Sequence, residues 1–371
     1  MRLTLLLLFI TLSARAQLTL RGQVLNAADG QPVPFCSVFL ANTTKGTTAD
    51  EQGQFVLTNV PAGRFELVAS SVGFETQAMP LPADPASTWQ IRLRPATNQL
   101  AEVQVRASRD PQWLENLATF QQLFIGTSQN ARQCAIVNPG ALWFDDNRAA
   151  RTLTAGAREP LVITNQALGY QIRYALTRFV YEYGRSYVSY LGYPVYEPLK
   201  PRNRREASRW AKARKEAYLG SPMHFMRALH QRRVEAEGFE LRRVLERTDS
   251  NSVDGTGQVK KARYLLNDKL PGTFLIDTDA SSDSLTVLTF SNLIQVTYTR
   301  ERESADYRRW LSPFGDNAQA AAPPQTSVIY LTEPAVTVEA NGNFYNQLGL
   351  VFEQYWSWEK LADLLPLTYQ P

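Results

Sequence analysis

The chain has few of the side chains on which metal sites and nucleophilic catalysis most often depend. Its 371 residues include only two histidines, His224 and His230, and two cysteines, Cys36 and Cys134. A zinc peptidase needs two histidines and a glutamate at motif spacing, because catalytic zinc takes three protein ligands. Neither histidine is followed by glutamate three residues on, and a six-residue separation on a helix points them about 240° apart. The sequence therefore argues against a zinc peptidase and predicts no metal, no cofactor and no catalytic residue.

Long hydrophobic runs are also scarce. Beyond residue 16, no window of about 18 residues is both apolar and uncharged, as a membrane-spanning helix requires. At the start, Arg2 precedes an apolar run from Leu3 to Leu12, and Ala14-Arg15-Ala16 fits a small-x-small cleavage pattern. We expect residues 1–16 to be a signal peptide cleaved after Ala16, which places the exported protein in the periplasm or against the outer membrane. An uncleaved anchor is the alternative, disfavoured by the short apolar run.

Excess charge of one sign is missing as well. The formal net charge of +4 falls to +2 when Arg2 and Arg15 leave with the signal peptide. A nearly balanced exported chain is not expected to bind nucleic acid. An oxidising compartment permits a Cys36–Cys134 disulfide. We favour two small buried thiols, because Cys36 alternates with apolar residues of a predicted strand.

Residues 17–95 carry the clearest pattern in the chain. Apolar and polar residues alternate in the stretches 55–57, 65–69 and 89–94. This period of two predicts antiparallel strands with one wet face. Turn residues separate the stretches, including Asp50 to Gly53 and Pro61-Ala62-Gly63. Together they predict a seven-stranded antiparallel β-sandwich.

The same stretch resembles a known family. The resemblance is carried by Gly22-Gln23-Val24, by Pro32 to Val38, by Asp50 to Phe55, by Gly63 and by Gly73-Phe74-Glu75. These residues are similar to the carboxypeptidase regulatory-like domain. The resemblance implies a transthyretin-like sandwich that is not catalytic. It also implies an exported Bacteroidetes protein, because such proteins, TonB-dependent outer-membrane receptors among them, often begin with this domain. The residues after 100 are too few for such a receptor's 22-stranded barrel.

The rest of the chain predicts a linker and strand over residues 96–110 and an α+β domain rich in antiparallel sheet over residues 111–371. The whole is therefore mainly β with helices. Apolar residues recur at three and four from Trp113 to Phe124, which predicts a helix that starts at Pro111. We expect further helices over 200–216, from Pro222 to Gly238 and from Trp356 to Leu365. Strands are expected at 100–106, 135–137, 142–144, 161–163, 262–266, 273–276, 285–290, 294–299, 328–331 and 336–338.

Three patterns have a functional and a structural interpretation, and in each we favour the structural one. Eight tyrosines between 170 and 196 suit a platform for sugars or a hairpin stabilised by cross-strand aromatic pairs. Basic residues dominate 200–216, which suits a strip for acidic glycans or lipid phosphates, or a solvated helix face. Asp277 to Asp283 resembles a calcium loop. It has Ser282 and Leu288 where glycine and glutamate are required, so a polar turn is expected.

No nucleophile, phosphate-loop or dinucleotide motif is present; Gly126 to Asn130 lacks the second glycine of a nucleophile elbow. Residues 220–229 and 355–366 are similar to segments of other exported Bacteroidetes proteins, which adds no activity. We therefore predict a non-catalytic exported binding or assembly module whose partner is unknown, with outer-membrane or cell-surface proteins or glycans as candidates. Two alternatives stay open: a glycan hydrolase that uses paired carboxylates, and a small outer-membrane barrel.

Overall fold

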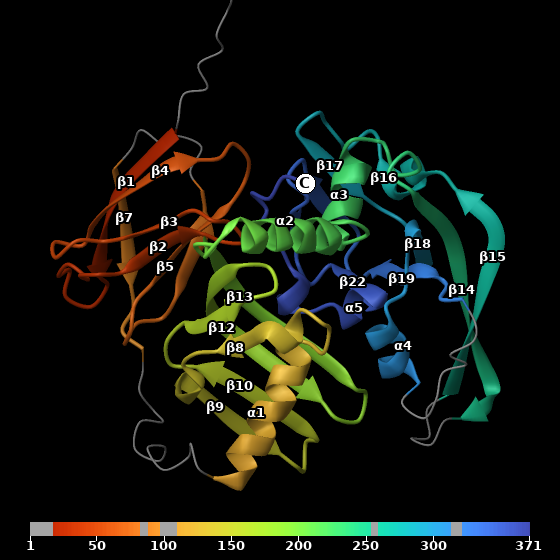
Figure 1. The fold of residues 1–371 in the computed structure, drawn as a ribbon, viewed down its shortest axis with the longest axis horizontal. Coiled ribbons are helices and arrows are strands. Elements are labelled where there is room, and N and C mark those ends of the chain that lie inside the picture. The colour runs from red at the N-terminus through yellow and green to blue at the C-terminus, as the bar shows by residue number, and fades with distance from the viewer. Residues whose placement is uncertain (1–17, 82–87, 97–109, 254–258, 313–320) are drawn as a thin grey trace, which may run out of the picture.

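The computed structural model describes residues 18–81, 88–96, 110–253, 259–312 and 321–371. It has three sheet-based parts: a front sandwich, a middle sheet and a pair of C-terminal sheets (Figure 1). The predicted signal peptide and the predicted strand at 100–106 lie outside the described residues. Within the described ranges, no helix is long and apolar enough to cross a membrane.

The front sandwich consists of two small sheets with the strand orders β4-β1-β7 and β3-β2-β5-β6. Their pairings are antiparallel except for β1 with β7, which run parallel. The predicted sandwich of seven strands is thus present, with one parallel pair. The strands are β1 (Leu18–Asn26), β2 (Ser37–Leu40), β3 (Gly46–Thr48), β4 (Gln54–Val60), β5 (Glu66–Ser70), β6 (Gln77–Pro80) and β7 (Thr88–Leu93).

The sandwich buries one face of each sheet, as the alternation predicted. Cys36 lies in this core beside Val38 and Leu40, and its thiol donates to the Ser70 carbonyl at 3.4 Å. Burial raises the pKa of the Cys36 thiol to about 12. Cys36 and Cys134 are both free thiols, so the alternative of a disulfide between them is wrong.

The middle sheet is built around the hairpin of β12 (Tyr170–Glu182) and β13 (Tyr187–Pro198). On its other edge, β12 pairs first with β11 (Leu161–Asn165) and then with β10 (Thr152–Ala157). The outer strands are β8 (Cys134–Ile136) and β9 (Leu142–Asn147). The short 3-10 turn η2 (Ala131–Gln133) precedes β8, and the 3-10 turn η3 (Pro139–Ala141) connects β8 to β9.

Helix α1 (Pro111–Phe124) packs on the middle sheet and confirms the predicted helix. Asp110 caps its start by accepting a hydrogen bond from the backbone N–H of Gln112. Its buried side stacks aromatic rings on the hairpin: Phe120 lies 4.8 Å from Phe179 between ring centroids. Aromatic pairs of this kind add stability beyond the area that they bury.

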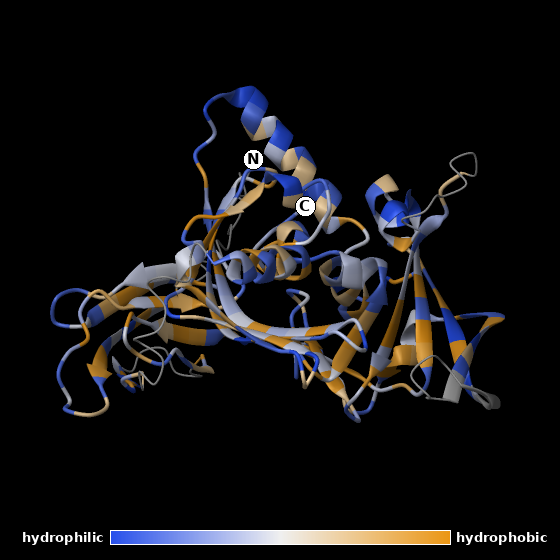
Figure 2. Ribbon diagram, turned by 90° about the horizontal axis from the view of Figure 1, so that it is seen from below, coloured by the Kyte–Doolittle hydropathy of each residue, from blue (hydrophilic) through white to orange (hydrophobic). Residues whose placement is uncertain are grey.

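The C-terminal part has two sheets that enclose the largest hydrophobic core of the chain. Hydrophobic and hydrophilic residues alternate along its strands (Figure 2). The first sheet contains β14 (Phe239–Val253), β15 (Val259–Leu270), β18 (Leu293–Arg302), β19 (Pro324–Leu331) and β22 (Leu350–Gln354). The second contains β16 (Ile276–Asp277), β17 (Leu285–Leu288), β20 (Val336–Glu339) and β21 (Phe344–Tyr345). The helical elements are α2 (Arg204–Tyr218), α3 (Pro222–His230), η4 (Gly272–Leu275), α4 (Ala305–Leu311), α5 (Tyr355–Trp358) and η5 (Leu361–Asp363).

Three predicted elements differ from those observed. Helix α3 ends at His230 and not at Gly238, because Arg232 adopts a left-handed backbone with φ +57°. Residues 272–275 form a 3-10 turn in place of most of the strand predicted at 273–276. The helix predicted from Trp356 to Leu365 stops at Trp358, since the backbone at Glu359 is extended.

Candidate functional site

The segment from Glu359 to Tyr369 connects the three parts of the molecule. Its Ala362 N–H donates to the Ile125 carbonyl at 3.2 Å, just after α1. Its Leu367 N–H donates to the Asn42 carbonyl of the sandwich at 2.7 Å. Arg227 of α3, which is buried, donates to the Leu367 carbonyl at 3.0 Å. These tertiary hydrogen bonds replace those that a continuous helix would make, so α5 is followed by the extended residue Glu359 and the short 3-10 turn η5.

A cavity of about 380 Å³ lies where the three parts meet, and we call it the central cavity. The C-terminal segment, the β12–β13 hairpin, the start of α3 and residues 342–348 form its walls. Its volume falls within the range of small-molecule sites, which are mostly apolar with a few converging polar groups. The aromatic side chains that line it are Tyr174, Tyr190, Tyr196, Phe344, Phe352 and Trp356.

Two further cavities adjoin the central one. A cavity of about 270 Å³ opens toward the sandwich, and one of about 460 Å³ opens toward β22 and α5. Gln347 and Leu348 line all three cavities, so residues 342–348 form the partition between them. A ligand longer than the central cavity would have to pass this partition.

Some of the eight tyrosines of the hairpin pack against other aromatic side chains, and some line the central cavity. Tyr170 packs edge-on against Tyr196 at 5.6 Å between ring centroids and lies under the Arg214 guanidinium. Tyr181 and Tyr183, at the end of β12, also pack edge-on, at 5.1 Å between ring centroids. The predicted hairpin is confirmed, and Tyr170 with Tyr196 is an aromatic pair across its strands. Tyr174, Tyr190 and Tyr196 additionally present their side chains to the central cavity.

Two carboxyl groups line the central cavity. Asp363 is only 8% exposed, and its Oδ1 accepts hydrogen bonds from Ser128 Oγ and Asn130 Nδ2, both at 2.9 Å. Its Oδ2 has no hydrogen-bond partner among the described residues. Glu359 contributes the second carboxyl group.

Burial determines the protonation of this acid pair, Glu359 and Asp363. Burial raises the pKa of Asp363 to about 6, against the hydrogen bonds from Ser128 and Asn130 that lower it. Burial also raises the pKa of Glu359 well above its ordinary value, and the neighbouring charge of Asp363 raises it further. Two nearby carboxyl groups in a poorly hydrated site share a proton more easily than they ionise together.

Lys360 follows Glu359 in the chain and lines the larger adjoining cavity. Burial lowers the pKa of Lys360 to about 8, because the charged ammonium group loses hydration. The central cavity itself has no lysine, arginine or histidine among the described residues that line it.

The histidines lie in separate environments. His224 is buried on α3, where its Nδ1 accepts from the Gly220 N–H at 3.1 Å. His224 is thus a packed histidine near the start of α3. His230 is half-buried, and its Nδ1 lies 3.2 Å from Thr286 Oγ1. Across the described residues, no group of three or more His, Cys, Asp or Glu side chains could hold a metal ion.

The remaining sequence patterns have structural roles. In the basic run, Trp210 is on the buried side of α2 and donates from Nε1 to the Gln166 carbonyl at 2.8 Å. Arg214 donates from Nε to the Leu168 carbonyl at 2.7 Å, which ties the helix to the middle sheet. Asp277 forms a polar turn by accepting from the backbone of Asp279 and Ala280, which confirms the turn prediction.

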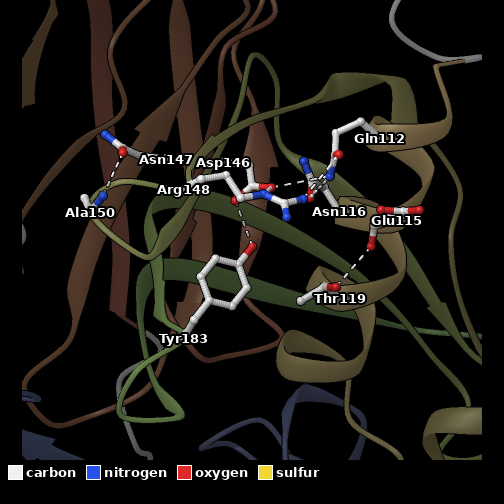
Figure 3. Close-up of polar contacts among 9 residues, drawn as sticks. All are labelled: Gln112, Glu115, Asn116, Thr119, Asp146, Asn147, Arg148, Ala150 and Tyr183. Atoms are coloured by element: carbon white, nitrogen blue, oxygen red, sulfur yellow. Dashed lines mark hydrogen bonds and ion pairs between the residues drawn. The ribbon is translucent and has the colours of Figure 1, made fainter. Parts of the chain in front are cut away.

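A separate, more polar pocket of about 390 Å³ lies between α1 and the β9–β10 turn (Figure 3). Asp146 is its centre: it accepts from Tyr183 Oη and from Arg148 Nε, each at 3.0 Å. Arg148 also donates to Gln112 of α1 at 3.4 Å. Because these groups satisfy one another, the pocket offers fewer free hydrogen-bonding atoms than its composition suggests.

Neither Glu359 nor Asp363 was predicted as a site residue. The one relevant signal in the sequence was the predicted helix from Trp356 to Leu365, in which two acids four residues apart would share a face. The structure brings these acids to one cavity by a different route, because the helix stops at Trp358 and the 3-10 turn η5 follows.

Comparison with known proteins places only the front of the chain. Residues 20–105 match the CarboxypepD_reg-like domain, in agreement with the sandwich and its resemblance. That domain is in general a non-catalytic regulatory or binding module. No curated protein matches the chain.

Among solved structures, the chain is similar to a 9R-lipoxygenase from Cyanothece PCC8801, at 9% sequence identity and a TM-score of 0.17. The match covers 60% of this chain and 48% of that one, so it extends over about half of the lipoxygenase. A likeness this weak carries no argument about fold or function.

Proposed function

We propose that the protein is a non-catalytic binding module, exported to the periplasm or the cell surface, that holds a small ligand in its central cavity. The observation that carries the proposal is the cavity itself, which has six aromatic walls and two acids where three parts of the chain meet. A site formed between several parts of a chain is typical of small-molecule binding.

The front sandwich fits this role as a spacer or dock. Its backbone N–H groups contact the C-terminal part directly: the Arg64 N–H donates to both carboxyl oxygens of Glu339, at 3.2 and 3.3 Å. Glu339 is buried, so the contact is part of the packed interior and not a loose surface encounter. Ligand binding in the central cavity is therefore expected to restrict the motion of the sandwich relative to the middle and C-terminal sheets.

Export is the second element of the proposal, and it rests on residues 1–16. Sequencing of the mature protein from cell envelopes should find Gln17 as its first residue. Recovery of the protein from the cytosol with Met1 attached would contradict export but not ligand binding.

Glycan hydrolysis is the competing function, and one observation favours it. Burial raises the pKa of both Glu359 and Asp363, which favours a protonated carboxyl group that could act as a general acid. Glycosidases use such a pair. Binding accounts better for the lining, which is largely aromatic and aliphatic and has few donors for sugar hydroxyls. Turnover of 4-nitrophenyl glycosides that Glu359→Gln abolishes would establish the enzyme.

The binding proposal is tested with the neutral apolar dye N-phenyl-1-naphthylamine, whose fluorescence rises in apolar sites. We expect the purified protein to bind the dye at one saturable site. Leu348→Trp should weaken binding, because Leu348 lines all three cavities.

The matched control is Leu114→Trp on α1. Leu348 and Leu114 are 53% and 50% exposed, so both variants should fold, and Leu114 lines none of the three cavities. Absence of saturable dye binding, or equal weakening by both variants, would contradict the proposal.

A further inference from the structure

The central cavity has an unusual balance of charge. Two carboxyl groups line it, and no basic side chain does so among the described residues. Buried acids normally occur with a partner, because an unpaired buried charge is strongly unfavourable. Here Lys360, the residue next to Glu359, lines the adjoining cavity and not the central one. Glu359 lines both cavities, so the described lining of the central cavity supplies two carboxyl groups without a basic side chain.

The hydrogen bonding of Asp363 points the same way. Ser128 and Asn130 hold Oδ1 in place, and both approach from the η2 region. Oδ2 is buried without a partner, although a buried carboxylate oxygen can accept two hydrogen bonds. Oδ2 is almost fully covered by protein, so a donor from a ligand would reach it only after a small shift of the surrounding side chains.

The aromatic side chains of the central cavity suit a ligand that has an apolar body beside its hydrogen-bond donor. Tyr174, Tyr190 and Trp356 present aromatic side chains to the same space. Aromatic faces attract ammonium groups through the ring quadrupole and bind apolar bodies equally well. Carboxylate, phosphate and sulfate groups would meet no basic side chain among the described residues that line the cavity.

We infer that the central cavity binds a small organic cation, with its ammonium group at Glu359 and Asp363 and its apolar body against the aromatic walls. The inference rests on the proposed binding function and gives the chemical class of the ligand. It excludes fatty acids, phosphorylated compounds and amino acids, whose carboxylate would lack a partner. The raised pKa of both carboxyl groups supports it, since a bound cation would restore the charge that burial disfavours.

The test uses three probes of nearly equal size: 2-phenylethylamine, 2-phenylethanol and phenylacetate. Each is titrated into the full-length mature protein by calorimetry and by displacement of N-phenyl-1-naphthylamine. We expect the amine to bind roughly tenfold or more tightly than the alcohol, since hydrogen bonds to charged groups are the stronger ones. Phenylacetate should bind weakest.

Two isosteric variants, Asp363→Asn and Glu359→Gln, remove charge from the acid pair and keep its shape. Each should remove most of the preference for the amine over the alcohol. Asp29→Asn serves as the control for a lost charge, because Asp29 is exposed on a sandwich turn far from the cavity in sequence. Chemical denaturation of each variant checks that it is folded.

The outcomes distinguish failure of the cation inference from failure of the proposed binding function. Equal affinity for amine and alcohol, tighter binding of phenylacetate, or an amine preference that survives in both variants would overturn the cation inference while dye binding upholds the cavity. Failure of the dye to bind removes the proposed function itself. An amine preference lost in Asp363→Asn and Glu359→Gln but kept in Asp29→Asn supports both.

Discussion

Ser128 and Asp363 are separated by 235 residues in the chain, yet Ser128 Oγ donates a hydrogen bond to Asp363 Oδ1 at 2.9 Å. Both residues are buried. The same Ser128 hydroxyl accepts from the Ala131 N–H at 3.2 Å, so it links the turn before η2 to the C-terminal segment. This pair fixes one wall of the central cavity to the middle sheet.

Replacing Ser128 with alanine should destabilise the protein by about 1–3 kcal/mol, because buried hydrogen-bonding groups lose a partner. Urea denaturation measures the change. Thr119→Ala is the matched control: Thr119 is half-buried and donates only to the Glu115 carbonyl within α1, so a change within about 0.5 kcal/mol is expected. Equal effects of the two substitutions would mean that the Ser128–Asp363 bond does not hold the segment.

Asp363 should make the stability depend on pH. Its pKa is raised from 3.8 in the unfolded chain to about 6 in the folded one, so the folded chain holds the proton more tightly. The corresponding stability is fully present below pH 3.8 and is lost as the pH rises through about 6. Glu359 and Glu301, whose pKa values burial also raises, act in the same direction.

Asp363→Asn should therefore gain on the wild type as the pH rises from about 4 to about 7, by an amount on the order of 2 kcal/mol. Denaturation curves at several pH values measure this difference. Asp29→Asn, which changes an exposed acid, is the reference. A constant gap between wild type and Asp363→Asn would show that the group ionises without penalty in the folded chain.

Gly192 lets the β12–β13 hairpin close against Tyr174. A Cβ at position 192 would lie 2.2 Å from Tyr174 Cε1 and 2.5 Å from the Ala175 carbonyl oxygen. Gly192→Ala should destabilise the protein by about 1–3 kcal/mol and displace the Tyr174 ring that lines the central cavity. Thermal denaturation and dye binding report the two effects.

Gly140→Ala provides the comparison for that substitution. Nothing lies within 4 Å of a Cβ at Gly140, and its backbone is not left-handed. This variant should be neutral or more stable by about 0.4–1 kcal/mol, because alanine restricts the unfolded chain. Similar losses in both variants would remove the packing argument for Gly192.

Lys360 should react with acylating reagents at a lower pH than ordinary lysines do. Burial lowers its pKa to about 8 from 10.5, so the reactive neutral amine is present near pH 8. Competitive acetylation with mass spectrometry should show its titration midpoint there, with the exposed Lys212 as the internal reference. A Lys360 midpoint that coincides with that of Lys212 would contradict the burial argument.

The front sandwich could be predicted because local pattern and tertiary structure agree there. Apolar residues alternate along Gln54–Val60, and the buried positions of β4 are the apolar ones. The turns contain residues that the backbone requires: Gly53 has φ +70°, and a Cβ there would lie 2.5 Å from the Val24 carbonyl oxygen. Short-range chemistry therefore determines this part of the fold.

The long strand β14 was not predicted. Charged residues are so frequent along it that the alternation of apolar and polar residues is not obvious in the sequence. In the structure these charges pair across the hairpin with β15: Lys269 lies 2.6 Å from Glu240, and Lys261 lies 2.7 Å from Glu246. Cross-strand ion pairs become visible only once the register is known.

The candidate site was beyond sequence reasoning for a related reason. Glu359 and Asp363 fit a helical pattern, and no local signal opposes that helix before Pro366. Hydrogen bonds from Ala362 to Ile125 and from Asn165 to Ala362 hold the segment as a short 3-10 turn in place of a continuous helix. These partners are more than 190 residues away in the chain, so the local pattern could not reveal them.

The order of synthesis gives the connecting segment a further consequence. Residues 359–369 emerge from the ribosome after the elements that they join, including α1 next to Ile125 and the turn at Asn42. The three sheets can therefore begin to form early, but the central cavity closes only when this late stretch lies between them. A nascent chain stalled before Glu359 would expose the aromatic residues of that cavity.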